Sequence, residues 1–331
     1  MSLPEEKDGV ELTVGFPAAP LTVSPSPHIK NPVTTAQLMR DVLIALFPAF
    51  LWGVWVFGVN ALLMPLISVV ACVFFEYITE KILRRPVTVR DLSAVVTGLL
   101  LGFNLPANNS YFLPVLGAAF AIIVVKQLFG GLGKNFVNPA LAARVFLFLS
   151  FPTQMTRFPV PFSRSAEIVI GATPRSGGAA ELLDLFFGRT GGSIGEVSVL
   201  LLLVGGIYLL ARRVITYQIP VAYLLTVAVV TLLFPAGGGF FSPTFMLREL
   251  FSGGLMLGAI FMATDYVTSP VTSRGRLIFG VGCGLLTVFF RYFGSYPEGV
   301  SFAILVMNCL VYYLDKLTLP RVFGGVRHAK K

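Results

Sequence analysis

Charged residues are scarce in this sequence. Only 12% of its 331 residues are Asp, Glu, Lys or Arg, whereas 55% are hydrophobic, and a soluble domain carries roughly 25% charged residues. A large buried core cannot explain so big a deficit, so the composition excludes an ordinary soluble domain. The apolar residues gather instead in repeated stretches close to the ~20 residues that cross a bilayer as a helix. The sequence therefore predicts a polytopic integral membrane protein.

Cysteine and histidine are also rare, which limits the metal chemistry that the chain could support. The three cysteines, Cys72, Cys283 and Cys309, lie inside apolar runs without C-x-x-C spacing, and the two histidines, His28 and His328, lie outside those runs. This pattern argues against a disulfide framework, a zinc site and an iron–sulfur cluster. The sequence also has no dinucleotide-binding fingerprint after a strand. We therefore expect no metal site, and packing roles for the cysteines.

Ten apolar segments follow a stretch of 40 residues that has no apolar core and begins acidic, so no cleavable signal peptide is expected. Prolines and glycines punctuate the ends of the segments. The segments cover approximately residues 41–59, 61–79, 91–106, 111–128, 139–151, 195–211, 217–235, 248–264, 275–293 and 299–316. The third and fifth are short for full spans. We expect an all-α polytopic membrane protein of about ten transmembrane helices.

The positions of lysine and arginine predict the orientation of the chain. With the N-terminus inside, nineteen of the 25 basic residues fall on the inner side and six on the outer side. An excess of positive charge marks the cytoplasmic side of a membrane protein, so both termini are predicted to be cytoplasmic. The net charge of +9 is concentrated in short loops between apolar runs. That placement explains it without a nucleic-acid partner.

A weak internal repeat relates the two halves of the chain. Gly98-Leu-Leu-Leu-Gly102 in the third segment recurs as Gly254-Leu-Met-Leu-Gly258 in the eighth, 156 positions later. Because each half holds five helices, an odd number, the halves would lie in opposite orientations. Inverted repeats of this kind commonly place a substrate, ion or cofactor site at their interface. The alternative is a chance similarity between two glycine-rich packing motifs.

This repeat predicts the domain organisation. The expected parts are a cytoplasmic N-terminal segment (1–40), a first five-helix repeat (41–151), an outer loop (152–194), a second five-helix repeat (195–316) and a cytoplasmic basic tail (317–331). The outer loop is the only long connection, and loops of this length are usually functional or disordered.

The outer loop contains a candidate attachment site for a phosphate ester. Thr173 lies in the run Ile170-Gly171-Ala172-Thr173-Pro174-Arg175-Ser176. A threonine between a small residue and a proline exposes its hydroxyl, and Arg175 could contact a phosphate. On spacing alone, an ordinary turn would be the better interpretation. A helix-like stretch, Ala179–Phe187, follows.

Among the ionisable side chains in or beside the apolar segments, three are candidates for a functional role, because a buried charge is costly unless it is paired or functional. Glu76 fits a solvated helix end better than an ion ligand, because further charged residues follow it. Lys126, near the inner end of the fourth segment, would snorkel to the interface by default. Asp265 follows the eighth segment near Arg274 and Arg276, so an interfacial salt bridge and a functional role both remain open.

Three longer motifs resemble the RnfD/NqrB family. The first is Lys126-Gln-Leu-Phe-Gly-Gly-Leu-Gly-Lys-Asn135, which ends at Asn138-Pro-Ala140. The second is Thr264-Asp265 followed by Thr272-Ser-Arg-Gly-Arg-Leu-Ile-Phe-Gly280. The third is Gly294-Ser-Tyr-Pro-Glu-Gly-Val300. These motifs are long enough that coincidence is implausible.

The resemblance runs from about Ser24 to Gly325, and the length of the chain makes it more similar to RnfD than to NqrB. It implies that FMN is esterified through its phosphate to Thr173, which matches the acceptor of the family's S-x-A-T motif. Ile170 stands where that motif has a polar residue. The resemblance also implies a second flavin, riboflavin, held non-covalently in the helix bundle. It further suggests that Asp265 takes up ions or orients a flavin, and a flavin-facing role for Lys126 is also compatible with it.

Members of this family are membrane subunits of the Rnf complex and of the sodium-pumping NADH:quinone reductase. The resemblance implies an electron-carrying subunit between ferredoxin and NAD, in a complex that moves Na⁺ or H⁺ across a bacterial inner membrane. Its expected partners are the FMN-bearing G subunit, the membrane A and E subunits, a flavin transferase and the lipid bilayer. No catalytic residue is assigned to the chain itself. The rival interpretation is an inverted-repeat channel or secondary transporter without a cofactor, which would not need the Thr173 loop.

Overall fold

A computed structural model of the chain describes residues 33–162, 182–196, 198–236, 240–294 and 299–320. By their contacts, residues 1–34 and residues 35–331 form separate units, and only Val33 and Thr34 of the first unit are described. Every regular element in the described residues is a helix. This agrees with the all-α class expected from the sequence.

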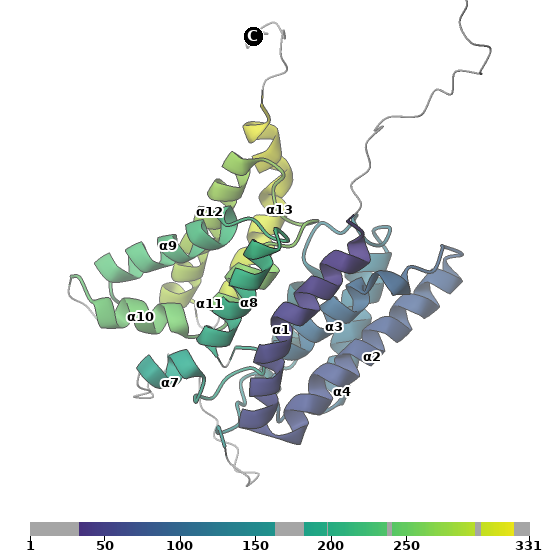
Figure 1. Cartoon of the computed structure of the whole chain (residues 1–331), viewed down its shortest axis with the longest axis horizontal. Helices are drawn as coiled ribbons and strands as arrows, with labels where there is room; N and C mark the ends of the chain where they lie inside the picture. Colours follow the sequence, from purple (N-terminus) through teal and green to yellow (C-terminus); the bar gives the residue numbers. More distant parts are fainter. Residues whose placement is uncertain (1–32, 163–181, 197, 237–239, 295–298, 321–331) are drawn as a thin grey trace, which may run out of the picture. The chain divides into compact units, whose positions relative to one another are not determined.

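Each of the ten apolar segments contains helix (Figure 1). The first half comprises α1 (Thr35–Phe57), α2 (Val59–Ile82), the short η1 (Val89–Asp91), α3 (Ser93–Phe103), α4 (Phe112–Ala119) with its π-helical continuation η2 (Phe120–Gln127), and α5 (Pro139–Ser150). The connecting region holds α6 (Pro152–Met155) and α7 (Leu182–Phe187). The second half comprises α8 (Val199–Ala211), α9 (Gln218–Leu233), α10 (Pro243–Phe251), α11 (Leu255–Leu257) with the π-helical η4 (Gly258–Met262), α12 (Ser273–Phe293) and α13 (Val300–Thr318).

Among the described residues, four helices are each long and apolar enough to cross a membrane, namely α1, α2, α12 and α13. They carry large apolar side chains on their exposed faces, including Trp55, Tyr312 and Phe293. A soluble protein would bury such side chains, whereas a membrane protein turns them toward lipid. The chain is therefore a multi-pass membrane protein.

The eighth predicted segment, 248–264, is not the single helix that its composition suggests. It divides into α10 and the α11–η4 pair, which are bent by 66° at the break between them. Gly253 and Gly254 form this break and both have a positive φ, 66° and 65°, a conformation in which a side chain is strained. The structure thus replaces one predicted straight span with a broken helix.

Small residues allow α2 and α3 to pack closely. A methyl group built on Gly102 would overlap Cα of Pro65, and one built on Gly98 would lie 2.6 Å from Cα of Val69. Neither backbone atom could move aside cheaply, so both positions need glycine. This matches the expected role of a G-x-x-x-G motif in membrane helix packing.

Helices from the two halves also pack against each other. α1 contacts α8, and α5 contacts α13; α1 and α8 lie side by side in Figure 1. The side chain of Asn138 caps α5 by accepting from the backbone amides of Ala140 (3.0 Å) and Leu141 (3.3 Å), and Pro139 occupies the first turn, where its missing N–H does no harm. The same asparagine donates to the carbonyl of Met262 at 3.2 Å, so it joins the start of α5 to the end of η4.

Three basic residues that entered the orientation count lie inside the bundle. Lys126, Arg144 and Arg291 are all buried, so they do not mark a membrane side. Their removal from the count leaves seventeen basic residues on the inner side against five on the outer side. Basic residues are still concentrated on the inner side, so the predicted orientation does not change.

Candidate functional site

The described residues enclose a pocket between the two halves of the chain. Its empty volume is about 750 Å³ including the part open to solvent. The walls come from the start of α1, from α3, the end of η2, the start of α5, the end of α8 and the segment after η4. The helix ends in this group all fall on the inner side in the orientation predicted from the sequence.

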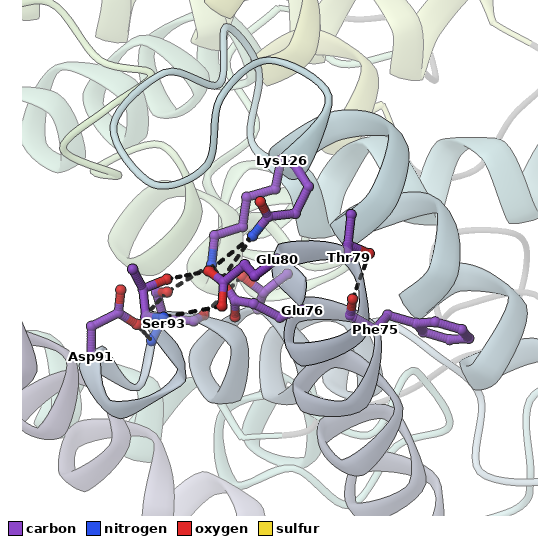
Figure 2. A network of polar contacts seen from close by, with 10 residues as sticks. Phe75, Glu76, Thr79, Glu80, Asp91, Ser93 and Lys126 are labelled. Carbon is purple, nitrogen blue, oxygen red and sulfur yellow. Dashed lines mark hydrogen bonds and ion pairs between the residues drawn. The ribbon is translucent and has the colours of Figure 1, made fainter. Parts of the chain in front are cut away.

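Lys126 contributes a buried cation to this pocket. Only 2% of its side chain is exposed, and Nζ lies 2.6 Å from Oε1 of Glu76. The same nitrogen donates to Oγ of Ser93 at 2.7 Å (Figure 2). The Ser93 hydroxyl in turn donates to Asp91 at 2.6 Å, and the Ser93 backbone amide donates to the same carboxylate oxygen at 2.8 Å. Lys126 is therefore held in one place by groups from α2 and the start of α3.

A second layer of polar groups stands behind this pair. Glu80 accepts from the backbone amide of Thr88 at 3.0 Å and from the Thr88 hydroxyl at 2.5 Å. Gln127 donates to Oε1 of Glu76 and to Oε1 of Glu80, both at 3.4 Å. Oε2 of Glu76 is buried without a hydrogen-bond partner. The network joins the inner end of α2 to η2.

Two expectations from the sequence are wrong here. Glu76 is not a solvated helix end, because its side chain is 0% exposed. Lys126 does not snorkel to the interface, because its charge is neutralised inside the bundle by Glu76. The fifty residues that separate the two side chains concealed the pairing from local sequence reasoning, which judged each charge by its neighbours along the chain.

Asp265 lines the same pocket, on the segment that follows η4. Its Oδ2 accepts from the hydroxyl of Thr268 at 3.0 Å. The predicted salt bridge with Arg274 or Arg276 does not form among the described residues. Arg276 instead donates to the carbonyl of Pro270 at 3.0 Å. Burial raises the pKa of the Asp265 carboxyl, and the hydrogen bond from Thr268 only partly opposes this rise.

The pocket therefore combines a fixed cation, a carboxylate and apolar walls. Lys126 and Asp265 come from different halves of the chain, and the amide side chains of Asn135 and Asn138 also line the cavity. Val96, Leu100 and Phe261 are among the apolar side chains that line it. A mostly apolar cavity with a few polar groups is typical of a small-molecule binding site. The sequence indicated Lys126 and Asp265 as site residues but not Ser93 or Asn135. Asn135 could have been found, because it is the last residue of the first family motif.

Thr173 and Arg175 lie outside the described residues. The parts of the connecting region that are described are attached to the C-terminal end of α1. Phe162 donates its backbone amide to the carbonyl of Val56 at 3.0 Å, and the indole N–H of Trp52 donates to the carbonyl of Gly188 at 3.2 Å. The pocket lies at the other end of α1, where Met39 lines it. At 1.5 Å per residue, Met39 and Val56 are roughly 25 Å apart along the helix.

Comparisons with known proteins show the family of the chain. Residues 22–324 match the model of the NQR2, RnfD, RnfE family. The chain is 45% identical over 320 residues to the D subunit of the Na⁺-translocating ferredoxin:NAD⁺ oxidoreductase complex of Acetobacterium woodii, covering 94% of this chain and 98% of that protein.

Two further relatives are similar over almost their whole length. The D subunit of the proton-translocating ferredoxin:NAD⁺ oxidoreductase complex of Clostridium ljungdahlii is 39% identical, over 92% of this chain and 97% of the relative. The D subunit of the ion-translocating oxidoreductase complex of Escherichia coli is 35% identical, over 91% and 98%. With a family match across residues 22–324 and such relatives, this chain belongs to the NQR2, RnfD, RnfE family.

Proposed function

We propose that this chain is the D subunit of an Rnf-type complex, which moves Na⁺ or H⁺ across the membrane while electrons pass between ferredoxin and NAD. The observation that carries this proposal is the similarity to D subunits over nearly the full length of both chains. The chain would act as an electron-carrying subunit of a translocase, with the A, E and G subunits as neighbours. It is not catalytic alone.

The proposed first cofactor is FMN, esterified to Thr173 by a flavin transferase. The support is the Gly171-Ala172-Thr173 acceptor run, followed by Arg175, whose guanidinium could contact the phosphate. The described ends of this loop are attached near Trp52 and Val56, at the end of α1 away from the pocket. A flavin there would supply one-electron and two-electron chemistry on the outer side of the membrane.

Mass spectrometry tests the covalent flavin. The tryptic peptide that begins at Ser165 should carry the mass of FMN less one water when the chain is co-expressed with a flavin transferase. In Thr173→Ala the peptide should be unmodified, because the accepting hydroxyl is gone, and fluorescence of the denatured chain should disappear. Acid extraction of the wild type should release a second, non-covalent flavin. An unmodified wild-type peptide would refute the ester.

The proposed site of the second flavin, riboflavin, is the pocket that Lys126 and Asp265 line. A ring system would fit between its apolar side chains, and the polar edge of an isoalloxazine needs donors and acceptors such as these residues and Asn135 offer. The chain's own contribution is to hold the ring, exclude water and fix the charge around it. Lys126 would favour negative charge on a ring edge beside it.

The finer architecture that we propose is ten spans in two inverted five-helix repeats, with both termini in the cytoplasm of a bacterial cell. The glycine motifs do not carry this proposal, because Gly98 lies within α3 whereas Gly254 precedes α11. Better support comes from Leu92 and Gly254, which stand just before α3 and α11 with nearly equal left-handed φ angles of 64° and 65°. The mutual packing of α1 with α8 and of α5 with α13 also fits a two-fold relation.

Labelling of introduced cysteines tests this topology. In intact cells, a cysteine at Thr190 should react with a membrane-impermeant thiol reagent, because the connecting region is placed outside. A cysteine at Lys330 should react only after the membrane is opened. The background is Cys309→Ser, since that side chain is exposed on α13. Reaction of both positions from the same side would mean that the number of spans is not ten.

The alternative function is an inverted-repeat channel or secondary transporter without a redox cofactor. The broken α10–α11 pair and the buried charges would suit such a protein. The two interpretations differ in flavin: a plain channel has no need of an acceptor threonine, so a colourless purified chain would favour the alternative.

A further inference from the structure

A second buried ion pair lies away from the pocket, where the two halves meet. Arg144 on α5 contacts Glu196, just before α8, with Nη1 2.9 Å from Oε1. The same guanidinium donates to Oδ1 of Asn104 at the end of α3. Both charged side chains are almost inaccessible, 7% and 3% exposed. Neither the proposed flavin sites nor the proposed electron path uses this pair.

The carboxylate of Glu196 is poorly satisfied for a buried charge. Both of its oxygens are buried and neither makes a hydrogen bond, although one contacts Arg144. The carboxylate lies against the break in the α10–α11 helix: a methyl group on Gly254 would overlap its Oε1. Two residues earlier in the same break, the hydroxyl of Ser252 is also buried without a partner.

Such a set of oxygens has the chemistry of a small-cation site. A buried carboxylate without hydrogen bonds is strongly disfavoured unless something else satisfies it. Carboxylate, hydroxyl and carbonyl oxygens are the ligands that hard cations prefer. Broken helices in transporters expose the oxygens that bind coupling ions, and Glu196 lies at such a break.

The contacts of Arg144 continue toward the pocket. The amide of Asn104 approaches Sδ of Met262 at 3.7 Å, and the carbonyl of Met262 accepts from Asn138 at 3.2 Å. Asn138 lines the pocket. Glu196 is therefore linked to the pocket through four residues in contact with one another. They are Arg144, Asn104, Met262 and Asn138.

We propose that Glu196 binds a small monovalent cation, Na⁺ or H⁺, through Oε2, which makes no hydrogen bond. For Na⁺, the Ser252 hydroxyl is a second ligand. Arg144 keeps its contact with Oε1 and its bond to Asn104, so the buried guanidinium is not left without acceptors. The role in ion transport rests on the proposed function, whereas the binding itself does not.

The other buried pair at this break serves as a matched control. Arg291 lies 2.9 Å from Oε2 of Glu249 and also donates to the carbonyls of Glu249 (2.6 Å) and Ser252 (2.9 Å). It thus caps the end of α10, where helix carbonyls lack partners. Glu249→Gln also removes one carboxylate from a buried arginine pair, but it leaves Glu196 intact.

The test uses the full-length chain in detergent, with thermal unfolding followed by tryptophan fluorescence. One titration replaces choline chloride with NaCl at constant ionic strength and about pH 8, and another lowers the pH to about 5.5 without Na⁺. A ligand that binds only the folded chain raises its melting temperature. We expect the rise with Na⁺ in the wild type and in Glu249→Gln, and its loss in Glu196→Gln. The acid titration compares the same three chains in an Asp265→Asn background, because the raised pKa of Asp265 would itself stabilise the folded chain at lower pH. There too, we expect the rise to be lost only with Glu196→Gln.

The two titrations show whether the bound cation is Na⁺ or H⁺. A rise with Na⁺ identifies a sodium site, and a rise with acid alone identifies a proton site. If Glu196→Gln does not fold, Glu196→Asp decides: its shorter carboxylate should move the Na⁺ midpoint by about threefold or more, or shift the pH midpoint. Wild-type responses that are absent, or that are unchanged in the Glu196 variants, would overturn the site. The covalent flavin on Thr173 could still be found in that case, so the proposed function would stand.

Discussion

Replacing Lys126 with methionine is expected to destabilise the chain by about 3–5 kcal/mol, because it leaves a buried carboxylate without its cation. Glu76 is fully buried and its Oε1 lies 2.6 Å from Nζ of Lys126. Without the ammonium group only the weaker donor Gln127, at 3.4 Å, remains beside it. The loss should appear as a lower melting temperature of the purified chain.

A double variant separates charge from packing. Lys126→Met combined with Glu76→Leu removes both charges and keeps the volume similar, and replacement of a whole buried pair is often neutral or stabilising. We therefore expect the double variant to recover most of the lost stability. The control is Lys81→Met, an exposed lysine 4.6 Å from the centre of the Tyr77 ring, for which the expected loss is about 0.5–1 kcal/mol. Equal losses in Lys126→Met and Lys81→Met would contradict the buried pair.

Composition and periodic apolar runs were sufficient to predict the positions of the helices. Each predicted apolar segment contains helix, and α12 lies within two residues of the predicted 275–293 at its start and ends with it. The break in the eighth segment could not be predicted in the same way. The spacing of Gly254 and Gly258 indicated a packing motif, whereas Gly254 has a left-handed φ of 65°. Hydropathy carries no information on backbone conformation.

Pairing between distant charges also escaped sequence reasoning. Hydropathy assigns Glu76 and Lys126 to helix ends, where solvation is the ordinary outcome. Their burial depends on how α2 packs against η2, which brings together side chains fifty residues apart. Arg144 presents the same difficulty: the orientation count assigned it to the inner side, whereas the structure buries it beside Glu196. The family motifs located Lys126 and Asp265, but the three-dimensional packing was needed to unite them in one pocket.

Asp265→Asn is expected to lower ion transport or electron transfer in the proposed complex by tenfold or more, which corresponds to about 1.4 kcal/mol or above. The carboxylate lines the pocket and accepts from Thr268 at 3.0 Å, so it can bind a cation or a polar edge of a flavin. Since it has no arginine partner among the described residues, the substitution breaks no salt bridge. Assembly and the flavin on Thr173 should remain intact. Arg274→Gln, at an exposed position of the same region, is the control.

The pH dependence of stability distinguishes a functional Asp265 from a structural one. Burial raises the pKa of Asp265 above that of a carboxyl in the unfolded chain. The folded chain therefore keeps the proton to a higher pH, and its free energy of unfolding falls as the pH rises from the unfolded pKa through the raised one. An asparagine side chain cannot ionise, so Asp265→Asn should lose this dependence and be at least as stable as the wild type at neutral pH. A group that the fold would be more stable without is retained for its chemistry. If the variant transports at the wild-type rate or unfolds more easily at neutral pH, Asp265 is a structural residue and the coupling group lies elsewhere.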